Sequence, residues 1–180
     1  VLLPGIGALV VAVMPNRRPE LIRLVAAVIS VATAAMTVWV LSAFEKSDTG
    51  FQLVSKHLWV PPWGISWHLG VDGISLFLVV LTGVLFPLTF LAVTPKHDPK
   101  AYYAWLLILQ AGCIGAFSAL DLFLFFIFFE IVLVPMYFLI GGWGYGERVY
   151  AAMKFFLFTM LGSAFMLVAI IATAFLHQRG

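Results

Sequence analysis

Residues 121–144 read DLFLFFIFFEIVLVPMYFLIGGWG, and this stretch decides the fold class of the chain. It holds about twenty residues dense in Phe, Ile, Leu and Val, enough to cross the hydrocarbon core of a bilayer as a helix. One carboxylate, Glu130, stands near its middle, roughly 13–17 Å along the axis from Asp121 and from Gly141 at the helical rise of 1.5 Å per residue. Its neighbours on the same helix face are apolar until Tyr137, two turns later. This helix alone therefore cannot provide a partner for its own acid.

An intramembrane carboxylate has two interpretations. A lone charge at that depth costs about 2.5–3.5 kcal/mol on insertion scales, so such groups are usually paired, hydrated or neutral. Glu130 is either a protonated acid that fixes helix packing or a group that carries protons, and we favour the second because intramembrane acids usually serve function. Pro135, five residues later, lacks an N–H donor and is expected to kink or loosen the helix just past the acid.

The composition of the whole chain agrees with a membrane protein. Of 180 residues, 63% are hydrophobic and 10% are charged, with a mean hydropathy of +1.09, which is typical of polytopic membrane proteins. We predict an all-α bundle of six transmembrane helices in a single membrane domain. The expected spans are residues 1–14, 21–44, 75–94, 101–119, 122–140 and 150–176. The formal net charge of +2 comes from loop residues and gives no support to nucleic-acid binding.

Lys and Arg in the short loops predict the orientation. One side would carry Arg17, Arg18, Arg23, Lys96, Lys100 and Arg148, and the other Lys46, Lys56 and Arg179. The first set should be cytoplasmic, which places the N-terminus outside. The long outer loop, residues 45–70, contains two alternating segments, 51–59 and 65–69, around a Pro-Pro-Trp-Gly turn. We expect a small extracytoplasmic β-hairpin on the membrane surface, with Trp59, Trp63 and Trp67 as interfacial anchors.

A few further polar residues lie within the expected spans. Gln110, Tyr137, Thr159 and Ser163 either make packing and interhelical hydrogen bonds or line a hydrated proton path. Lys154 lies about 6–9 Å past Tyr150 and Arg148 along the helix. It either extends to the cytoplasmic interface or passes protons between the cytoplasm and Glu130. Asp121 is expected to cap the helix that carries Glu130.

Several cofactor chemistries have no support in the sequence. Cys113 is the single cysteine, so the chain has neither a disulfide nor a thiolate metal site of its own. The four histidines stand in expected loops or at helix ends, so paired haem ligands across helices are absent. No glycine-rich nucleotide loop is present. We therefore expect no cofactor and no metal in this chain.

Three groups of residues carry a resemblance to a known family. They are residues 69–76, LGVDGISL; residues 129–131, FEI, with 135–136, PM, and 139–144, LIGGWG; and residues 151–156, AAMKFF, with Thr159 and 162–163, GS. Together the sequence resembles antiporter-like subunit M (chain 4) of the proton-translocating NADH:quinone oxidoreductase, respiratory complex I. The resemblance covers essentially the whole chain. Family members are longer, so it implies that these residues are the N-terminal portion.

The resemblance implies a function for specific residues. The central pumping Glu of the family falls on Glu130, and its helix-six Lys falls on Lys154. FMN, iron–sulfur clusters and quinone are then expected in partner subunits, and neighbouring antiporter-like and other membrane subunits are the expected partners. The location would be the cell inner (plasma) membrane, or the mitochondrial inner membrane in a eukaryote. The alternatives are a subunit of a related cation/proton antiporter or membrane-bound hydrogenase, and a scaffold that does not pump.

Overall fold

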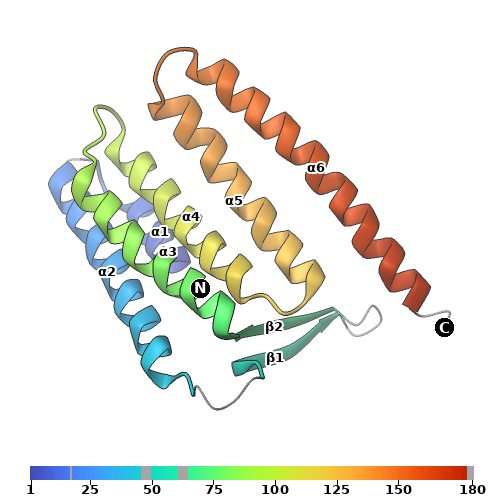
Figure 1. The fold of residues 1–180 in the computed structure, drawn as a ribbon. Coiled ribbons are helices and arrows are strands. Elements are labelled where there is room, and N and C mark those ends of the chain that lie inside the picture. The colour runs from blue at the N-terminus through green and yellow to red at the C-terminus, as the bar shows by residue number, and fades with distance from the viewer. Residues whose placement is uncertain (17, 46–49, 61–64, 178–180) are drawn as a thin grey trace.

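The computed structural model describes residues 1–16, 18–45, 50–60 and 65–177 of the chain. Within these ranges the chain forms six helices and two strands in the order α1, α2, β1, β2, α3, α4, α5, α6 (Figure 1). Their bounds are α1 Leu2–Val13, α2 Pro19–Ala43, β1 Gln52–Val60, β2 Ile65–Val71, α3 Gly73–Ala92, α4 Pro99–Ser118, α5 Leu122–Trp143 and α6 Arg148–His177. The predicted helical membrane protein with a small two-stranded sheet is confirmed.

Five of the helices are long and apolar enough to cross a membrane: α2 to α6, over Pro19–Ala43, Gly73–Ala92, Pro99–Ser118, Leu122–Trp143 and Arg148–Leu176. The sixth, α1, has 12 residues. At 1.5 Å per residue it is about 18 Å long, against a hydrocarbon core of about 30 Å. The described residues thus contain five membrane-span candidates, and α1 is a shorter apolar helix.

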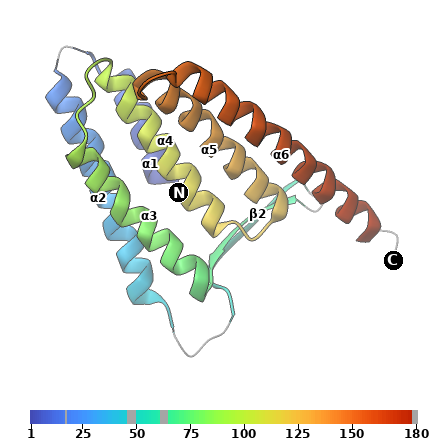
Figure 2. The ribbon, with the colours of Figure 1, turned by 45° about the horizontal axis from the view of Figure 1, so that its top comes forward.

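Helices α1 to α5 pack side by side, with α6 at the edge against α5 (Figures 1 and 2). The connections α1–α2, α3–α4 and α5–α6 lie at one end of the bundle, and the two-stranded sheet lies at the other (Figure 1). Arg18, Lys96 and Arg148 belong to the first end and Lys56 to the second. The loop charges are therefore asymmetric in three dimensions as well. Arg17, Lys46 and Arg179 lie outside the described residues.

The core of the bundle is built mainly from α1, α2 and α4. Phe90 of α3 stacks on Tyr103 of α4 with ring centroids 5.7 Å apart. Close approach of α4 to α5 depends on two glycines, because a Cβ on Gly112 would lie 2.8 Å from Val132 and one on Gly115 would overlap the ring of Phe128. Small residues at such contacts are the usual means by which membrane helices come into close contact.

Strands β1 and β2 pair antiparallel, with Lys56 opposite His68 and His57 opposite Trp67. The predicted turn at residues 61–64, with Trp63, lies outside the described residues. The sheet is fixed to the bundle through β2, because Leu120 N–H donates to the His68 carbonyl (2.9 Å) and Trp67 packs edge-on against Phe128 of α5 (5.8 Å between centroids). Trp67 is thus partly a packing residue, whereas Trp59 is exposed as an anchor would be.

Two carboxylates begin the neighbouring helices. Asp72 accepts hydrogen bonds from Ser75 N–H (2.7 Å) and Ile74 N–H (3.1 Å), and Ser75 Oγ accepts one from Asp72 N–H. The bonds from Ser75 and Ile74 stabilise the charged form and hold the pKa of Asp72 below its usual value. Asp121 caps α5, accepting from Phe123 and Leu124 N–H, as the sequence predicted.

Candidate functional site

Glu130 stands in the middle of α5, eight residues after Leu122 and thirteen before Trp143. At 1.5 Å per residue these separations are about 12 and 20 Å, well inside a hydrocarbon core. The side chain is half-buried, and its Oε1 atom is buried with no hydrogen-bond partner among the described residues. A polar atom in that situation is costly unless water or another group binds it.

The neighbour of Glu130 on α6 follows from the register between α5 and α6. The rings of Tyr137 and Phe156 lie 5.3 Å apart, and a Cβ on Gly141 would lie 3.4 Å from the Cβ of Ala152. Moving back two turns along α5 from Tyr137, and forward two turns along α6 from Phe156, reaches Glu130 and Ser163. Counting three turns back along α5 from Gly141, and three turns forward along α6 from Ala152, leads to the same two residues. The two antiparallel helices therefore place Ser163 opposite Glu130.

Ser163 is buried to an extent that is unusual for its helix. Helix α6 is mostly exposed, yet Ser163 is 5% exposed and Ala152 is 1% exposed. The Ser163 hydroxyl donates to the Met160 carbonyl at 3.0 Å, which leaves its oxygen lone pairs free to accept. A hydroxyl with acceptor capacity thus lies at the level of an acid that has a buried, unpartnered oxygen.

Three of the four polar candidates share this helix contact. Tyr137 and Glu130 lie on the same face of α5, seven residues apart, and Thr159 lies one turn before Ser163 on α6. Thr159 Oγ1 donates to the Phe155 carbonyl at 2.8 Å. We call Glu130, Tyr137, Thr159 and Ser163 the α5–α6 seam. The structure brings these residues together along one line between two helices.

Lys154 lies elsewhere on α6. It is two residues from Ala152, about 200° around the helix, so it points away from α5. The side chain is exposed, and its Nζ lies 5.8 Å from the ring centroid of Tyr150. The structure places Lys154 about 13 Å along the axis from Ser163, toward the end of the bundle with the short loops.

Gln110 is also separated from the seam. Gly112 and Gly115 define the face of α4 that meets α5, and Gln110 lies two residues, or about 200°, from Gly112. It is fully buried on the opposite side, and both of its amide atoms lack hydrogen-bond partners within the described residues. Ser30 of α2 is a further fully buried, unpartnered polar group, for which the sequence pattern holds no signal.

Pro135 lies inside α5 and is buried. It has no N–H to donate, so the carbonyl of Ile131, next to Glu130, lacks its usual helical partner. The helix nevertheless continues to Trp143. A free backbone carbonyl beside the acid adds a site where water can bind within the helix interior.

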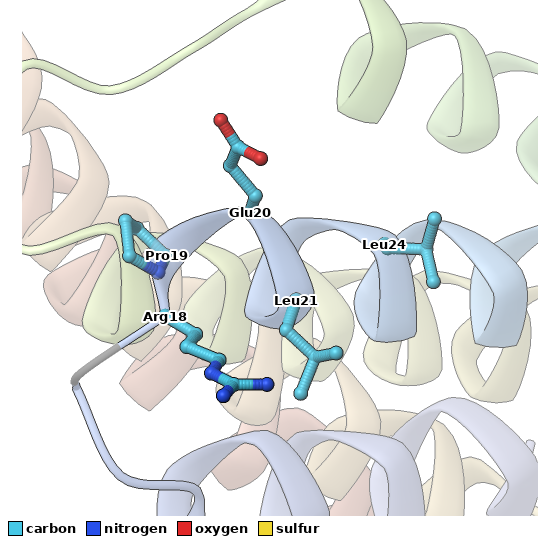
Figure 3. Close-up of a pocket in the computed structure, with 5 residues that line it drawn as sticks. All are labelled: Arg18, Pro19, Glu20, Leu21 and Leu24. Atoms are coloured by element: carbon cyan, nitrogen blue, oxygen red, sulfur yellow. The ribbon is translucent and has the colours of Figure 1, made fainter.

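Two hollows lie away from the seam. One, of about 460 Å³, is formed at the start of α2 by Arg18, Pro19, Glu20, Leu21 and Leu24; Glu20 points away from Arg18 and Leu21 (Figure 3). The other, of about 350 Å³, lies between α1 and α4, with Lys100 and Trp105 in its lining. Neither includes a residue of α5 or α6. Among the described residues, no group of three or more His, Cys, Asp or Glu side chains could hold a metal ion.

Comparison with known proteins gives one consistent answer. The sequence profile of the family described as NADH:quinone oxidoreductase/Mrp antiporter, transmembrane, matches residues 119–180. NADH-quinone oxidoreductase subunit M of Rickettsia typhi is 42% identical over 158 residues, covering 87% of this chain and 32% of that protein. NADH-ubiquinone oxidoreductase chain 4 of Marchantia polymorpha is 40% identical over 174 residues, covering 95% of this chain and 35% of that protein.

A solved structure shares the fold. A chain of the membrane-bound sulfane sulfur reductase, an archaeal respiratory membrane complex, superposes with a TM-score of 0.78 at 24% identity, over 93% of this chain and 34% of that one. At that identity the likeness concerns the fold alone. The chain spans about a third of the length of the curated relatives that it matches.

Proposed function

Because the chain belongs to the NADH:quinone oxidoreductase/Mrp antiporter family, as a relative of its subunit M (chain 4) members, we propose that it moves protons through the membrane as part of an NADH:quinone oxidoreductase. The observation that carries the proposal is the buried, unpartnered oxygen of Glu130 opposite Ser163 in the middle of α5. Intramembrane acids that face a neighbouring helix are the groups that proton-moving proteins use.

In this proposal Glu130 binds and releases one proton as the charges around it change. A nearby cation favours the carboxylate and release of the proton, whereas withdrawal of the cation favours the neutral acid and uptake. Glu130 is the group that titrates in this proposal. Ser163, Thr159 and Tyr137 provide hydroxyls along the α5–α6 seam through which water can carry a proton to it.

Lys154 and Gln110 have secondary roles in the proposal. Lys154 lies toward the short-loop end and on the outer face of α6, so it would exchange protons with the cytoplasm and with groups that cover that face. Gln110 is on the far side of α4, so it can join the path only through water behind that helix. Both roles are weaker than that of Glu130 because neither side chain lies in the α5–α6 seam.

The proposed function requires other subunits to carry out the redox chemistry. NADH oxidation and quinone reduction, with FMN, iron–sulfur clusters and quinone, belong to other subunits in this proposal. Neighbouring antiporter-like and other membrane subunits are the proposed partners, and the bilayer surrounds the bundle. The chain is multi-pass in the cell inner membrane, or in the mitochondrial inner membrane, with its N-terminus and the β1–β2 sheet outside.

A cation/proton antiporter is the second candidate function. The description of the matched family names both complexes, and it is this observation that keeps the alternative open. Purification of the tagged full-length subunit separates the two candidates. Co-purification of an NADH-oxidising activity supports the oxidoreductase, and its absence from an intact membrane complex supports the antiporter.

The proton-carrier role is tested by two substitutions at one position. Glu130→Gln keeps the shape and most hydrogen bonding but removes the titration, so the complex should assemble while the initial rate of NADH-driven proton pumping falls at least about ten-fold, the equivalent of about 1.4 kcal/mol in activation free energy. Glu130→Asp keeps the acid and should retain partial activity. Glu147→Gln, in the α5–α6 connection, is the matched control and should pump normally.

A packing role makes a different prediction for the same variants. If Glu130 only fixes helix contact, Gln is tolerated and Asp is at least as harmful, since it withdraws the group by one methylene. A Glu130→Gln complex that assembles and pumps like the parent would therefore disprove the proton-carrier role.

A further inference from the structure

The Gln110 side chain is buried with both of its polar atoms unpaired among the described residues, which is unusual for a residue that only packs. Its side chain is 0% exposed, and neither Oε1 nor Nε2 has a partner in the described part of the chain. Buried amides in native proteins almost always bind protein groups or ordered water. Because Gln110 stands on the side of α4 away from α5, the α5–α6 seam does not supply that partner.

The neighbour of Gln110 on α3 can be located by register in two ways. Phe90 of α3 stacks on Tyr103 of α4, and two turns along each antiparallel helix from this pair lead to Gly83 and Gln110. Val79 of α3 and Ile114 of α4 share a small core cluster, and one turn along each helix leads to the same two residues. Gly83 therefore lies at the level of Gln110, on the stripe of α3 that carries Val79 and Phe90.

The Gly83 carbonyl lacks the donor that a regular helix would provide. Pro87 is buried within α3, four residues after Gly83, and it has no N–H to donate to the Gly83 carbonyl. The third helix closes this junction, because a Cβ on Gly83 would overlap the hydroxyl of Thr37 on α2. Thr37 is 5% exposed and donates its proton to the Ala34 carbonyl (2.8 Å), so its oxygen is left to accept.

We propose that the Gln110 amide, the Gly83 carbonyl and the Thr37 hydroxyl bind a buried water molecule between α2, α3 and α4. The hydrogen-bond directions are compatible: the water accepts from Gln110 Nε2 and donates to the Gly83 carbonyl and to either Gln110 Oε1 or Thr37 Oγ1. Buried waters typically make about three such bonds to otherwise unsatisfied groups. Neighbouring groups and water are also the usual means by which a proline break in a membrane helix is satisfied.

This water would link the middle of α4 to the Gly83 carbonyl of α3, which Pro87 leaves without its usual helical donor. It is separate from Glu130, because α4 lies between the two sites, and it does not depend on the proton path. Its role is to add a polar contact between α2, α3 and α4 in the middle of the bundle.

The direct test is a high-resolution cryo-EM map of the assembled complex. We expect a density peak within hydrogen-bond distance of both the Gln110 amide and the Gly83 carbonyl, and we expect Gln110→Leu to remove it. A map in which Gln110 bonds directly to protein groups, with no peak at Gly83, overturns the proposal.

A thermal double-mutant cycle tests the role of the proline break. Gln110→Leu should lower the unfolding temperature of the assembled subunit by about 2–4 °C, the shift that a hydrogen-bonding loss of this kind produces in a chain of this size. Pro87→Ala restores a donor to the Gly83 carbonyl, so the same Gln110→Leu change should cost less than half as much in that background.

The matched control for the cycle is Ser118→Ala. Ser118 is also buried on α4, but its hydroxyl already donates to the Ile114 carbonyl at 2.7 Å. Its effect should be the same with and without Pro87→Ala. The contrary result is that Gln110→Leu lowers the unfolding temperature by the same amount in the parent and in the Pro87→Ala background, as expected for Ser118→Ala. In that case the Gly83 carbonyl is not part of the site and the proposal fails.

Discussion

Glu130 of α5 and Ser163 of α6 lie opposite each other across the contact between the two helices, one with a buried, unpartnered carboxylate oxygen and the other with a buried hydroxyl. The register that pairs them is fixed by two contacts nearer the loop, Tyr137 with Phe156 and Gly141 with Ala152. Ser163 is thus the α6 side chain best placed to bind either protonation state of the acid, because a hydroxyl both donates and accepts.

Ser163→Ala should reduce NADH-driven pumping about five-fold with normal assembly, since one hydrogen bond is worth about 1 kcal/mol. Ser163→Thr restores a hydroxyl and should recover most of the activity. The control is Thr173→Val, which removes an exposed hydroxyl of the same helix that bonds only its own backbone. Equal pumping by the Ser163→Ala and Thr173→Val variants would remove Ser163 from the path.

Lys154→Ala should weaken coupled pumping less than Glu130→Gln does and leave assembly intact. The reason is its position: the ammonium group is exposed on the outer face of α6 and lies over the Tyr150 ring. Membrane-potential measurements on vesicles containing both variants give the comparison. Pumping at the parent rate in Lys154→Ala would show that this lysine only reaches the membrane surface.

Asp72 gives a pH-dependent contribution to stability. Its pKa is lower in the folded chain than in the unfolded one, so its stabilising effect is present at pH values above its unfolded pKa, about 4. The effect is lost as the pH falls through the folded pKa. At pH 7 Asp72→Ala should cost about 1 kcal/mol through loss of the cap.

Asp72→Asn separates the cap from the charge. Asn caps a helix about as well as Asp but does not titrate, so this variant should be nearly as stable as the parent at pH 7. The difference between parent and Asp72→Ala should shrink below about pH 4, whereas the difference between Asp72→Asn and Asp72→Ala should persist. Unfolding temperatures across this range provide the measurement, and a pH-independent difference for the parent would contradict the assignment.

The orientation of the bundle can be checked by cysteine labelling in a Cys113→Ser background. His57→Cys, in exposed β1, should react with an impermeant reagent added outside intact cells, and Lys96→Cys, in the α3–α4 connection, should not. The asymmetry of Lys and Arg between the two ends of the bundle is the reason for this expectation. Labelling of position 96 alone would reverse the topology.

Local features of the fold were predictable because each depends on a short stretch of sequence. Helices α2 to α6, the β1–β2 pairing and the Asp121 cap follow from apolar length, alternation and a capping residue. The predicted first span, residues 1–14, forms the 12-residue helix α1, which is too short to stand among the five membrane-span candidates.

The arrangement of the site was less accessible to sequence reasoning. Periodicity places Glu130 and Tyr137 on one face of α5, but it does not say which helix meets that face or at which level. Ser163 is identified as the neighbour of Glu130 through two contacts that the sequence does not announce, Tyr137 with Phe156 and Gly141 with Ala152. The side chain of Lys154, which the sequence offered as a step between the cytoplasm and Glu130, is exposed on α6.

Among the described elements, α6 packs extensively only against α5, so its position along that helix is set by a single line of contacts. A slip of one turn, about 5.4 Å, is the natural step for such a pair. In one direction the slip would exchange Ser163 for Thr159 and keep a hydroxyl in front of Glu130. In the other direction it would bring Leu167 there and close the acid off from any hydroxyl. The sequence of α6 thus makes the two directions of such a slip chemically unequal for Glu130.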